Sequence, residues 1–571
     1  MENTNNFFNN PNYNGYLAEY RGDFLNQINK IDYATGVILT PKLVALYINP
    51  NDLMRIRKDV PSITLIDFSE AFVLEELSPN FVSNIDVMKL NPYLNLNGNG
   101  VLIGIVDSGI DYLNKEFMQE DGTTRILTLW DQSDENNKSE DLYIGRSYTE
   151  ADINNAIKLF NDGGDPYSIV SEKDNVGHGT KVAGIAGGRG YLENFSGIAT
   201  NSKFAIVKLK QSAFFKNINK LNGVKDVPVY QSCDIFAAVN YISNFASEQN
   251  LPAVVILSLG STVGSHDGND IFSKYLNKIS NRRPFIILTG VGNEGASEGH
   301  AQGKISSVGE TKKIELVIPS ILKVLKLKIW IKKPNKMSIN IFSPSGEQSQ
   351  FIKTRPNQSD EINYITEDTN LKVKFSFPDS ITGGQVISLT WLDIKPGIWT
   401  LLLKGEYIVG GEFNTWLPPS STLPPGTKFF NSTSDTTFTA PSSTPNIISV
   451  GYYNSLTSST VSYSGKGFSI AHIIKPDIAA PGINILTTKV GGGLTTISGS
   501  SAALPIAAGV CALLLQWGVV DGNDIIMTPS KIRSYLITGA YRKNLVSYPN
   551  KEEGFGYLDL KGVFDIISGN F

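Results

Sequence analysis

The stretch VLIGIVDS, residues 101–108, is almost continuously apolar up to the aspartate and serine that end it. Three later stretches have the same character: KFAIVKL (203–209), AVVILSL (253–259) and PFIILTG (284–290). Strands that are covered on both faces show this continuous apolarity, whereas half-exposed strands alternate apolar with polar residues. Because helical segments separate these stretches, the sequence predicts an α/β fold with a parallel sheet flanked by helices.

A different pattern occupies residues 301–430. Short stretches there alternate apolar with polar residues and are separated by Pro, Gly, Asn and Asp, which is typical of an all-β sandwich. They are KIELVIP, VLKLKIWIKK, MSINIFSP, LKVKFSFPD, VISLTWLD and GIWTLLLKG. The α/β pattern returns with NIISVGYYN (446–454), after a stretch rich in Pro, Ser and Thr. We therefore expect one α/β domain, residues 76–300 and 436–571, interrupted by an inserted β domain, residues 301–435.

The first 75 residues have a third character. The helix-like stretch GDFLNQINKI is mixed there with three short strand-like stretches, TGVILT, LVALYI and ITLIDF. This mixture predicts a small α+β unit at residues 1–75, ahead of the α/β domain.

Composition excludes several classes of protein without naming one. The 571 residues are 41% hydrophobic and 18% charged, as in globular proteins, and the net charge of −4 argues against a nucleic-acid binder, which usually has a basic face. The N-terminal stretch lacks the basic start and apolar core of a signal peptide, so we expect synthesis in the cytoplasm without one. The most apolar stretch, GVCALLLQWGVV (509–520), is shorter than the roughly 18 residues of a membrane span and predicts a buried helix instead.

The sequence contains no motif of a metal or cofactor site, and calcium dependence stays open. Its two cysteines, Cys233 and Cys511, lie far apart and outside any metal-ligand pattern, so both are interpreted as core residues, with a bridge between them left open. No run of carboxylates has the spacing of an EF-hand calcium loop.

Three residues combine into a candidate catalytic site. Asp107 ends the first apolar strand, where the ligands of parallel sheets gather, and His178 stands between two glycines at the start of a predicted helix. Ser501 stands at the start of the most apolar helix of the chain. Taken singly, the aspartate has the character of a turn residue, the histidine of a structural residue and the serine of a helix cap. Together, in the order Asp, His, Ser, they match one of the known chain orders of serine-hydrolase triads.

The motifs around these residues resemble the three signatures of the subtilase family. They are IVDSGID (105–111), GHGTKVAGIAGG (177–188) and GSSAALPIAAG (499–509). SLGS (258–261) resembles the family's substrate-binding strand, and GVGNEG (290–295) the segment with the oxyanion asparagine. The approach to the serine, KPDIAAPG, also fits. The resemblance implies a subtilisin-like fold and serine endopeptidase activity toward protein substrates.

It also implies a role for each matching residue. Ser501 would be the nucleophile, His178 the base and Asp107 the group that orients it, while Asn293 and the Ser501 backbone N–H would bind the oxyanion. The matching substrate-binding residues are Ser258, Leu259, Gly260, Thr289, Gly290, Val291 and Gly292. The chain departs from the family in having Ser500 where threonine is common, and GVGN in place of an alanine-rich approach to Asn293.

The overall organisation is similar to that of the clostridial germination proteases, the Csp subtilases of spores. That similarity implies a prodomain that is cut off near Phe72 to Ser78 and stays bound in the cleft, and an insert of jelly-roll type. It further implies that the protein is incorporated into the spore and cuts the zymogen of a cortex-degrading hydrolase during germination.

Two other functions remain open at this point. Some relatives in that group are pseudoproteases that signal in germination, and a blocked cleft would permit the same here. The insert could instead bind carbohydrate, although its tryptophans, Trp330, Trp391, Trp399 and Trp416, are predicted to fill the sandwich core or its junction.

Overall fold

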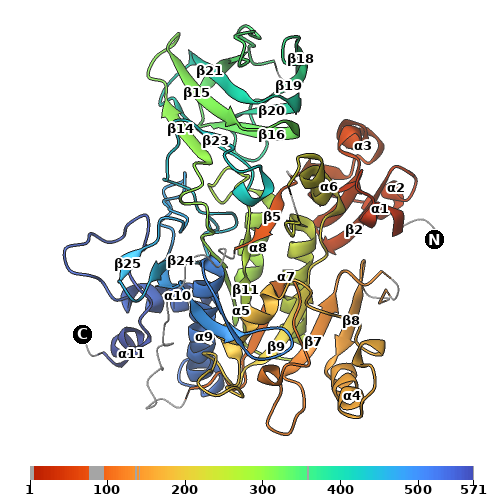
Figure 1. Cartoon of the computed structure of the whole chain (residues 1–571), viewed down its shortest axis with the longest axis vertical. Helices are drawn as coiled ribbons and strands as arrows, with labels where there is room; N and C mark the ends of the chain where they lie inside the picture. The colour runs from red at the N-terminus through yellow and green to blue at the C-terminus, as the bar shows by residue number, and fades with distance from the viewer. Residues whose placement is uncertain are drawn as a thin grey trace.

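The central sheet contains all four continuously apolar stretches as parallel neighbours. They form β6 (Leu102–Asp107), β9 (Lys203–Lys208), β11 (Ala253–Leu257) and β13 (Phe285–Gly290). Within the part of the chain that the computed structural model describes, residues 5–67, 69–75, 96–135, 138–139, 142–224, 226–355 and 359–569, this sheet has nine strands. Its other members are β7 (Ile126–Asp131), β8 (Arg146–Thr149), β24 (Ile448–Asn454), β25 (Ser459–Thr460) and β26 (Ile478–Pro481). The predicted α/β class is confirmed (Figure 1).

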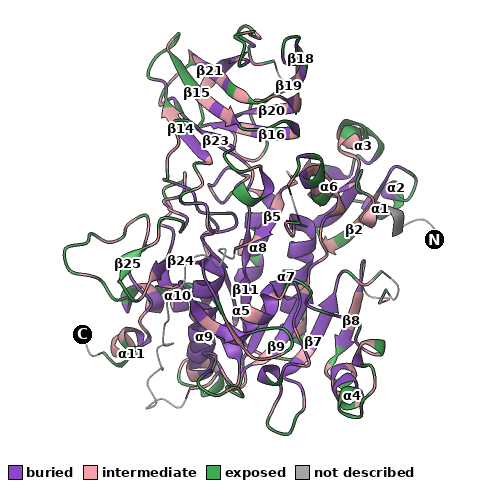
Figure 2. Cartoon of the chain, in the orientation of Figure 1, coloured by how far each residue is buried: buried purple, intermediate pink, exposed green. Residues whose placement is uncertain are grey.

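Both faces of this sheet are covered, which explains why its strands lack alternation. In β6, Ile103 and Ile105 point into one apolar core and Leu102 and Val106 into a second. The first core contains α5 (His178–Gly187) and α9 (Ser500–Leu515), and the second contains α7 (Ser232–Glu248) and α8 (Ile271–Ser280). Further helices are α4 (Glu150–Asn161), α6 (Ala213–Leu221), α10 (Pro529–Thr538) and α11 (Leu560–Ser568). Figure 2 shows α7 and α9 buried along most of their length.

Helix α9 is the apolar helix that was expected to begin near Ser501. Together with the turn that continues it to Val520, it is the one described helix long and apolar enough to cross a membrane, and 78% of its most apolar window is buried inside the protein. The two cysteines, Cys233 in α7 and Cys511 in α9, are both free and buried, in agreement with the prediction of core residues.

The N-terminal unit is an antiparallel sheet in the order β2-β3-β1-β4, with short helices. Its elements are α1 (Asn5–Asn9), β1 (Asn14–Tyr20), α2 (Phe24–Ile28), β2 (Ala34–Thr40), β3 (Leu43–Ile48), α3 (Leu53–Asp59) and β4 (Ile63–Ile66). One face of β1 and β3 packs on α7 and α8 through Leu17 and Tyr47. The last strand of this sheet ends at Ile66, and the chain continues into β5 (Ala71–Leu74), which belongs to a different sheet.

Two antiparallel sheets enclose a separate apolar core between residues 300 and 429. One has the order β14-β22-β16-β20-β19-β18 and the other β17-β21-β15-β23. Their strands are β14 (His300–Lys304), β15 (Thr311–Ile318), β16 (Leu322–Ile331), β17 (Lys336–Phe342), β18 (Ser359–Tyr364), β19 (Thr369–Ser376), β20 (Gln385–Ile394), β21 (Gly397–Tyr407), β22 (Glu412–Trp416) and β23 (Lys428–Phe429). Trp391 and Trp399 fill the core between them, whereas Trp330 and Trp416 form a small cluster with Val386. The jelly-roll topology stays a prediction, and so do the domain boundaries. The predicted boundary at residues 75 and 76 adjoins residues 76–95, which lie outside the described residues.

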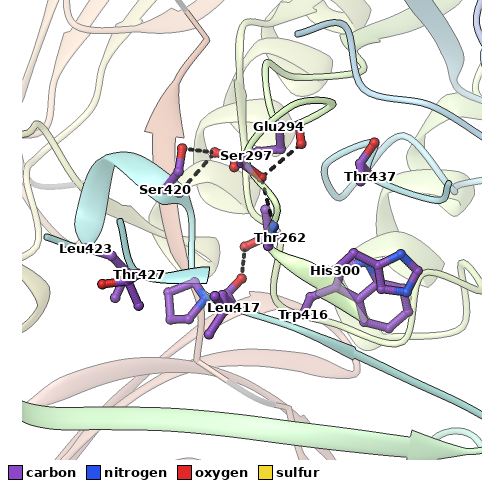
Figure 3. Close-up of a pocket in the computed structure, with 12 residues that line it drawn as sticks. Thr262, Glu294, Ser297, His300, Trp416, Leu417, Ser420, Leu423, Thr427 and Thr437 are labelled. Atoms are coloured by element: carbon purple, nitrogen blue, oxygen red, sulfur yellow. Dashed lines mark hydrogen bonds between the residues drawn. The ribbon is translucent and has the colours of Figure 1, made fainter. Parts of the chain in front are cut away.

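Trp416 lies at the junction of this β unit with the α/β domain, and Figure 3 shows it beside His300 and near the hydrogen bonds that Thr262 and Ser420 make. Its ring stacks between His266, which follows β12 (Leu259–Gly260) of the α/β domain, and His300, the first residue of β14. Nearby, the Thr262 hydroxyl donates to the Leu417 carbonyl at 2.6 Å, and Ser420 donates from both its N–H and its hydroxyl to Glu294. Since Glu294 follows Asn293 directly, the β unit is hydrogen-bonded to the segment that carries the predicted oxyanion residue.

We predict that Trp416→Ala destabilises the protein by about 3 to 5 kcal/mol, because it empties a buried stack of three rings. Chemical denaturation followed by circular dichroism measures the loss. Trp416→Phe keeps one aromatic ring in the stack and is expected to cost clearly less. Equal stability of Trp416→Ala and the unchanged protein would contradict this view of the junction.

Candidate active site

Asp107, His178 and Ser501 lie in one hydrogen-bonded row. His178 Nε2 is 2.8 Å from Ser501 Oγ, and His178 Nδ1 is 2.7 and 2.9 Å from the two oxygens of Asp107. All three side chains are buried, and they come from parts of the chain that are 71 and 323 residues apart. This is the geometry of a Ser-His-Asp triad, in which the carboxylate fixes the tautomer of the imidazole.

The fold places each member at the end of an element. Asp107 is the last residue of β6, and the Ser108 N–H holds one of its oxygens at 2.7 Å. His178 begins α5 after Gly177, whose φ of 77° favours glycine. The Asp174 carboxylate accepts hydrogen bonds from the Gly177 N–H and from Thr180, so it fixes the start of α5. Sequence reasoning missed Asp174, although its position four residues before His178 was visible.

Segment 71–75 of the chain occupies the cleft beside Ser501. Its strand β5 pairs antiparallel with β10 (Tyr230–Gln231) on one side and with β12 on the other. At the end of the strand, the Ser501 N–H donates to the Glu75 carbonyl oxygen at 3.1 Å, and the Glu75 N–H donates to the Ser258 carbonyl at 3.4 Å. The Glu75 carbonyl is therefore held at the start of α9, next to the Ser501 hydroxyl.

The predicted oxyanion residue Asn293 lies at the same helix start. Its Oδ1 accepts the Ser500 N–H at 3.1 Å. A Cβ on Gly499 would lie 2.9 Å from the Glu75 carbonyl oxygen and 3.0 Å from Asn293 Nδ2, so the donor end of the amide and the carbonyl both adjoin Gly499. Gly499 has a φ of 103°, and only glycine fits here, both for its backbone angle and for the close approach.

The Glu75 side chain lies in a small pocket. The Thr439 hydroxyl donates to its Oε1 at 2.6 Å, and a Cβ on Gly260 or Gly290 would collide with its carboxyl oxygens. Burial raises the pKa of Glu75 from its ordinary 4.5 to about 7, although hydrogen bonds from Thr439 and Ser500 oppose the shift. The pocket therefore favours the neutral carboxyl.

The other predicted substrate-binding residues lie in three places around Ser501 and the Glu75 pocket. The Ser258 hydroxyl donates to Ser501 Oγ at 2.9 Å, and Leu259 and Gly260 pair with Leu74 and Val73 of β5. Gly292, with a φ of 74°, donates its N–H to Ser500 Oγ and lies against Thr439. Thr289 and Val291 are fully buried, and Val291 bonds through its backbone to Val450 and Thr439, so they support the pocket from behind.

Besides Asp174, two residues of the site were not singled out from the sequence. Thr439 lies in the stretch rich in Ser, Thr and Pro, where nothing distinguishes it from the neighbouring hydroxyl residues. Glu75 lies at the predicted domain boundary. Within the described residues, no group of three or more His, Cys, Asp and Glu could hold a metal ion.

Comparison with known proteins agrees with this geometry. The model of the subtilase family, Peptidase S8, matches residues 98–384 and 422–557, about three quarters of the chain. The chain belongs to the subtilase family. Among solved structures, this subtilase is similar to the CspB protease of Clostridium perfringens, with 30% sequence identity, a TM-score of 0.74, and coverage of 83% of this chain and 94% of that one.

Curated relatives match with lower identity or over shorter stretches. The subtilisin-like protease SBT3.15 of Arabidopsis thaliana is 23% identical over 494 residues, which cover 80% of this chain and 57% of the relative. The serine protease AprX of Bacillus subtilis is 34% identical over 92 residues, 14% of this chain and 20% of the relative. The matches thus span less than two thirds of the length of these curated relatives.

We predict that Asn293→Ala slows peptide-bond cleavage by about 10² to 10³, because a side-chain donor to the oxyanion is lost. The rate is measured as the appearance of the larger fragment that remains when the chain is cut near the predicted junction, Phe72 to Ser78. Thermal unfolding serves as a control, since the variant also removes the acceptor of the Ser500 N–H. An unchanged rate in a folded variant would remove Asn293 from the oxyanion site.

Proposed function

We propose that this subtilase is a serine endopeptidase that cleaves its own chain after Glu75. The observation that carries the proposal is the position of the Glu75 carbonyl. It accepts the Ser501 N–H at 3.1 Å, while Ser501 Oγ lies 2.8 Å from the base His178. A carbonyl held by an oxyanion donor beside an activated hydroxyl is a substrate in place for attack.

The reaction follows from these contacts. His178 takes the proton of Ser501 as the hydroxyl oxygen bonds to the carbonyl carbon of Glu75, and Asp107 stabilises the imidazolium. The Ser501 N–H and Asn293 hold the negative oxygen of the tetrahedral intermediate. The C–N bond then breaks, and the leaving amine takes the proton from His178. Water, deprotonated by His178, finally releases the new carboxyl end of Glu75 and restores Ser501.

The N-terminal unit acts in this proposal as a prodomain that stays bound after cleavage. Its sheet packs on α7 and α8 through Leu17 and Tyr47, and β5 remains paired on both edges. Tyr47 also donates to Asp234 of α7. Because these contacts do not depend on the cleaved bond, the cut segment continues to fill the cleft until it is displaced.

The proposed physiological substrate is the zymogen of a spore cortex-degrading hydrolase, cut during germination by protein that was made in the cytoplasm and incorporated into the spore. Support comes from the similarity to the CspB protease of Clostridium perfringens over most of both chains. A cleft that is filled by the chain itself also suits an enzyme that must stay silent before a signal.

That filled cleft favours a second candidate, a regulatory pseudoprotease that keeps its triad without using it. The two functions differ in one observable, which is cleavage after Glu75. A protein that remains whole under all conditions, and still binds a partner in germination, would be the second candidate.

We predict that the purified protein splits into residues 1–75 and the remainder, and that Ser501→Ala stays whole, because the nucleophile is gone. Intact mass and N-terminal sequencing of the larger fragment measure this. Ser498→Ala, which changes a neighbouring serine whose hydroxyl contacts Asn484, is the matched control and is expected to split. Cleavage of Ser501→Ala at the same rate would exclude the proposed triad.

We also predict that retention of the cut prodomain weakens as pH rises. The bound Glu75 carboxyl has a pKa of about 7 against an ordinary 4.5, so binding is strongest below pH 4.5 and declines until pH 7. The change is on the order of 100-fold in the dissociation constant. Gel filtration of the cut complex across this pH range measures it.

Glu75→Gln is the control for this prediction, because its amide does not titrate. Two other titratable side chains influence Glu75, namely His178 and Glu294, and cleavage adds a third group, the new α-carboxyl of residue 75. Any pH dependence that remains in Glu75→Gln belongs to these groups. A pH profile identical in the two proteins would refute the assignment to Glu75.

A further inference from the structure

The β unit reaches the N-terminal end of the peptide that fills the cleft. A cavity of about 220 Å³ lies there between the prodomain, α6 and β16. Ser69 and Glu70 line it from the prodomain, Phe214 from α6, and Lys326, Lys328 and Trp330 from β16. Figure 1 shows α6 between β16 and the N-terminal unit.

The place of Glu70 in the peptide is fixed by β5, the strand that follows it. Glu70 directly precedes β5, and the carbonyl of Glu75, which follows β5, accepts the Ser501 N–H. Glu70 is therefore the sixth residue before the scissile bond. Its Oε1 lies 3.5 Å from the Cβ position of Gly264, in the loop after β12. Any peptide that continues the β5 pairing N-terminally enters the same cavity.

The charges in this cavity are complementary. The prodomain brings Glu70 to the lining, with Asp67 outside it but near enough to act on the pKa of Glu70, and β16 brings Lys326 and Lys328, which project from one face because they are two residues apart on a strand. Burial is the main cause that raises the pKa of Glu70, with Asp270 and Asp67 adding to it, and Lys328 lowers it. Burial likewise lowers the pKa of Lys328 to about 7, and the carboxylates of Glu70, Asp67 and Asp379 oppose that shift.

A neutral residue at this position would leave the Lys328 ammonium partly buried with one carboxylate fewer beside it. A half-buried charge is stabilised by an opposite charge and penalised without one, so such a site discriminates between peptides. Two amide atoms of the cavity wall, Asn14 Oδ1 and Asn219 Nδ2, are buried with no hydrogen-bond partner within the described residues. Asn219 belongs to the α/β domain and remains available when another peptide replaces the prodomain.

We propose that the inserted β unit forms the far end of the substrate cleft, where Lys328 binds a carboxylate six residues before the scissile bond. The proposal deepens the proposed function and rests on it. The prodomain is the first peptide to use this subsite, and a protein substrate must carry Asp or Glu at the same position to compete with it.

Two peptides in one reaction test the subsite. Both span residues 66–79, one as in the chain and the other with Glu70→Gln, and they carry different mass tags. The ratio of their cleavage rates equals the ratio of kcat/KM, and bound prodomain lowers both rates equally. We expect the Glu70 peptide to be cut about tenfold faster, which corresponds to about 1.4 kcal/mol.

Substitutions in β16 test whether Lys328 causes the preference for the Glu70 peptide. Lys328→Met is expected to bring the ratio to one, and Lys328→Arg to retain the preference. Lys323→Met is the matched control on the same strand, since Lys323 pairs with Asp393 and is exposed, and it is expected to keep the tenfold ratio. Equal cleavage of both peptides by the unchanged enzyme, or a ratio unaffected by Lys328→Met, would overturn the proposal.

Failure of the proposed function looks different, because neither peptide would then be cut. In that case the rate of amide hydrogen exchange at residues 69–75 in the full chain tests the contact between Lys328 and Glu70. Lys328→Met and the chain variant Glu70→Gln are each expected to speed this exchange, and the double variant to add nothing further. Unchanged exchange in both single variants would refute the subsite.

Discussion

The first turn of an α-helix leaves its backbone N–H groups without acceptors inside the helix, and the site of this protein is arranged around one of them. In α9 that group is the Ser501 N–H, which donates to the Glu75 carbonyl. Ser501 carries both the N–H donor and the hydroxyl nucleophile. Both groups therefore lie next to the same carbonyl group, in positions that the helix start fixes. Gly499 makes the approach possible, since it has neither the Cβ nor the backbone preference that would block it.

The remaining elements serve to bring partners to this helix start. The parallel sheet ends β6 at Asp107, and the left-handed turn at Gly177 begins α5 with His178 already within reach of Ser501. Burial on both faces of the sheet holds these ends in place, because a shift of one strand would displace both cores. A triad made of three distant segments is therefore as rigid as the sheet itself.

The three units of the chain share one cleft. The α/β domain provides the triad and two edge strands, the N-terminal unit provides the peptide between them, and the β unit is tied to the loops that follow β12 and Asn293. A disturbance at the Trp416 stack can consequently reach Glu294 and the oxyanion segment next to it. The same peptide is held at one end by the hydrogen bond from Thr439 to the Glu75 carboxyl, and at the other end Glu70 lines a cavity together with Lys328.

The sequence by itself determined the fold class and the triad candidates. Continuous apolarity marks a strand that is covered on both faces, and the motifs around Asp107, His178 and Ser501 are local in the chain, so both can be read without coordinates. The strand that ITLIDF predicts ends at Ile66, and no local pattern indicates that Phe72, a few residues later, pairs with Tyr230 in the cleft. Only the tertiary structure decided that Glu75 meets Ser501, that Thr439 lines its pocket, and that Lys328 and Glu70 line one cavity. These contacts join segments hundreds of residues apart, and no local pattern of hydrophobicity encodes which strand edge a short segment will pair with.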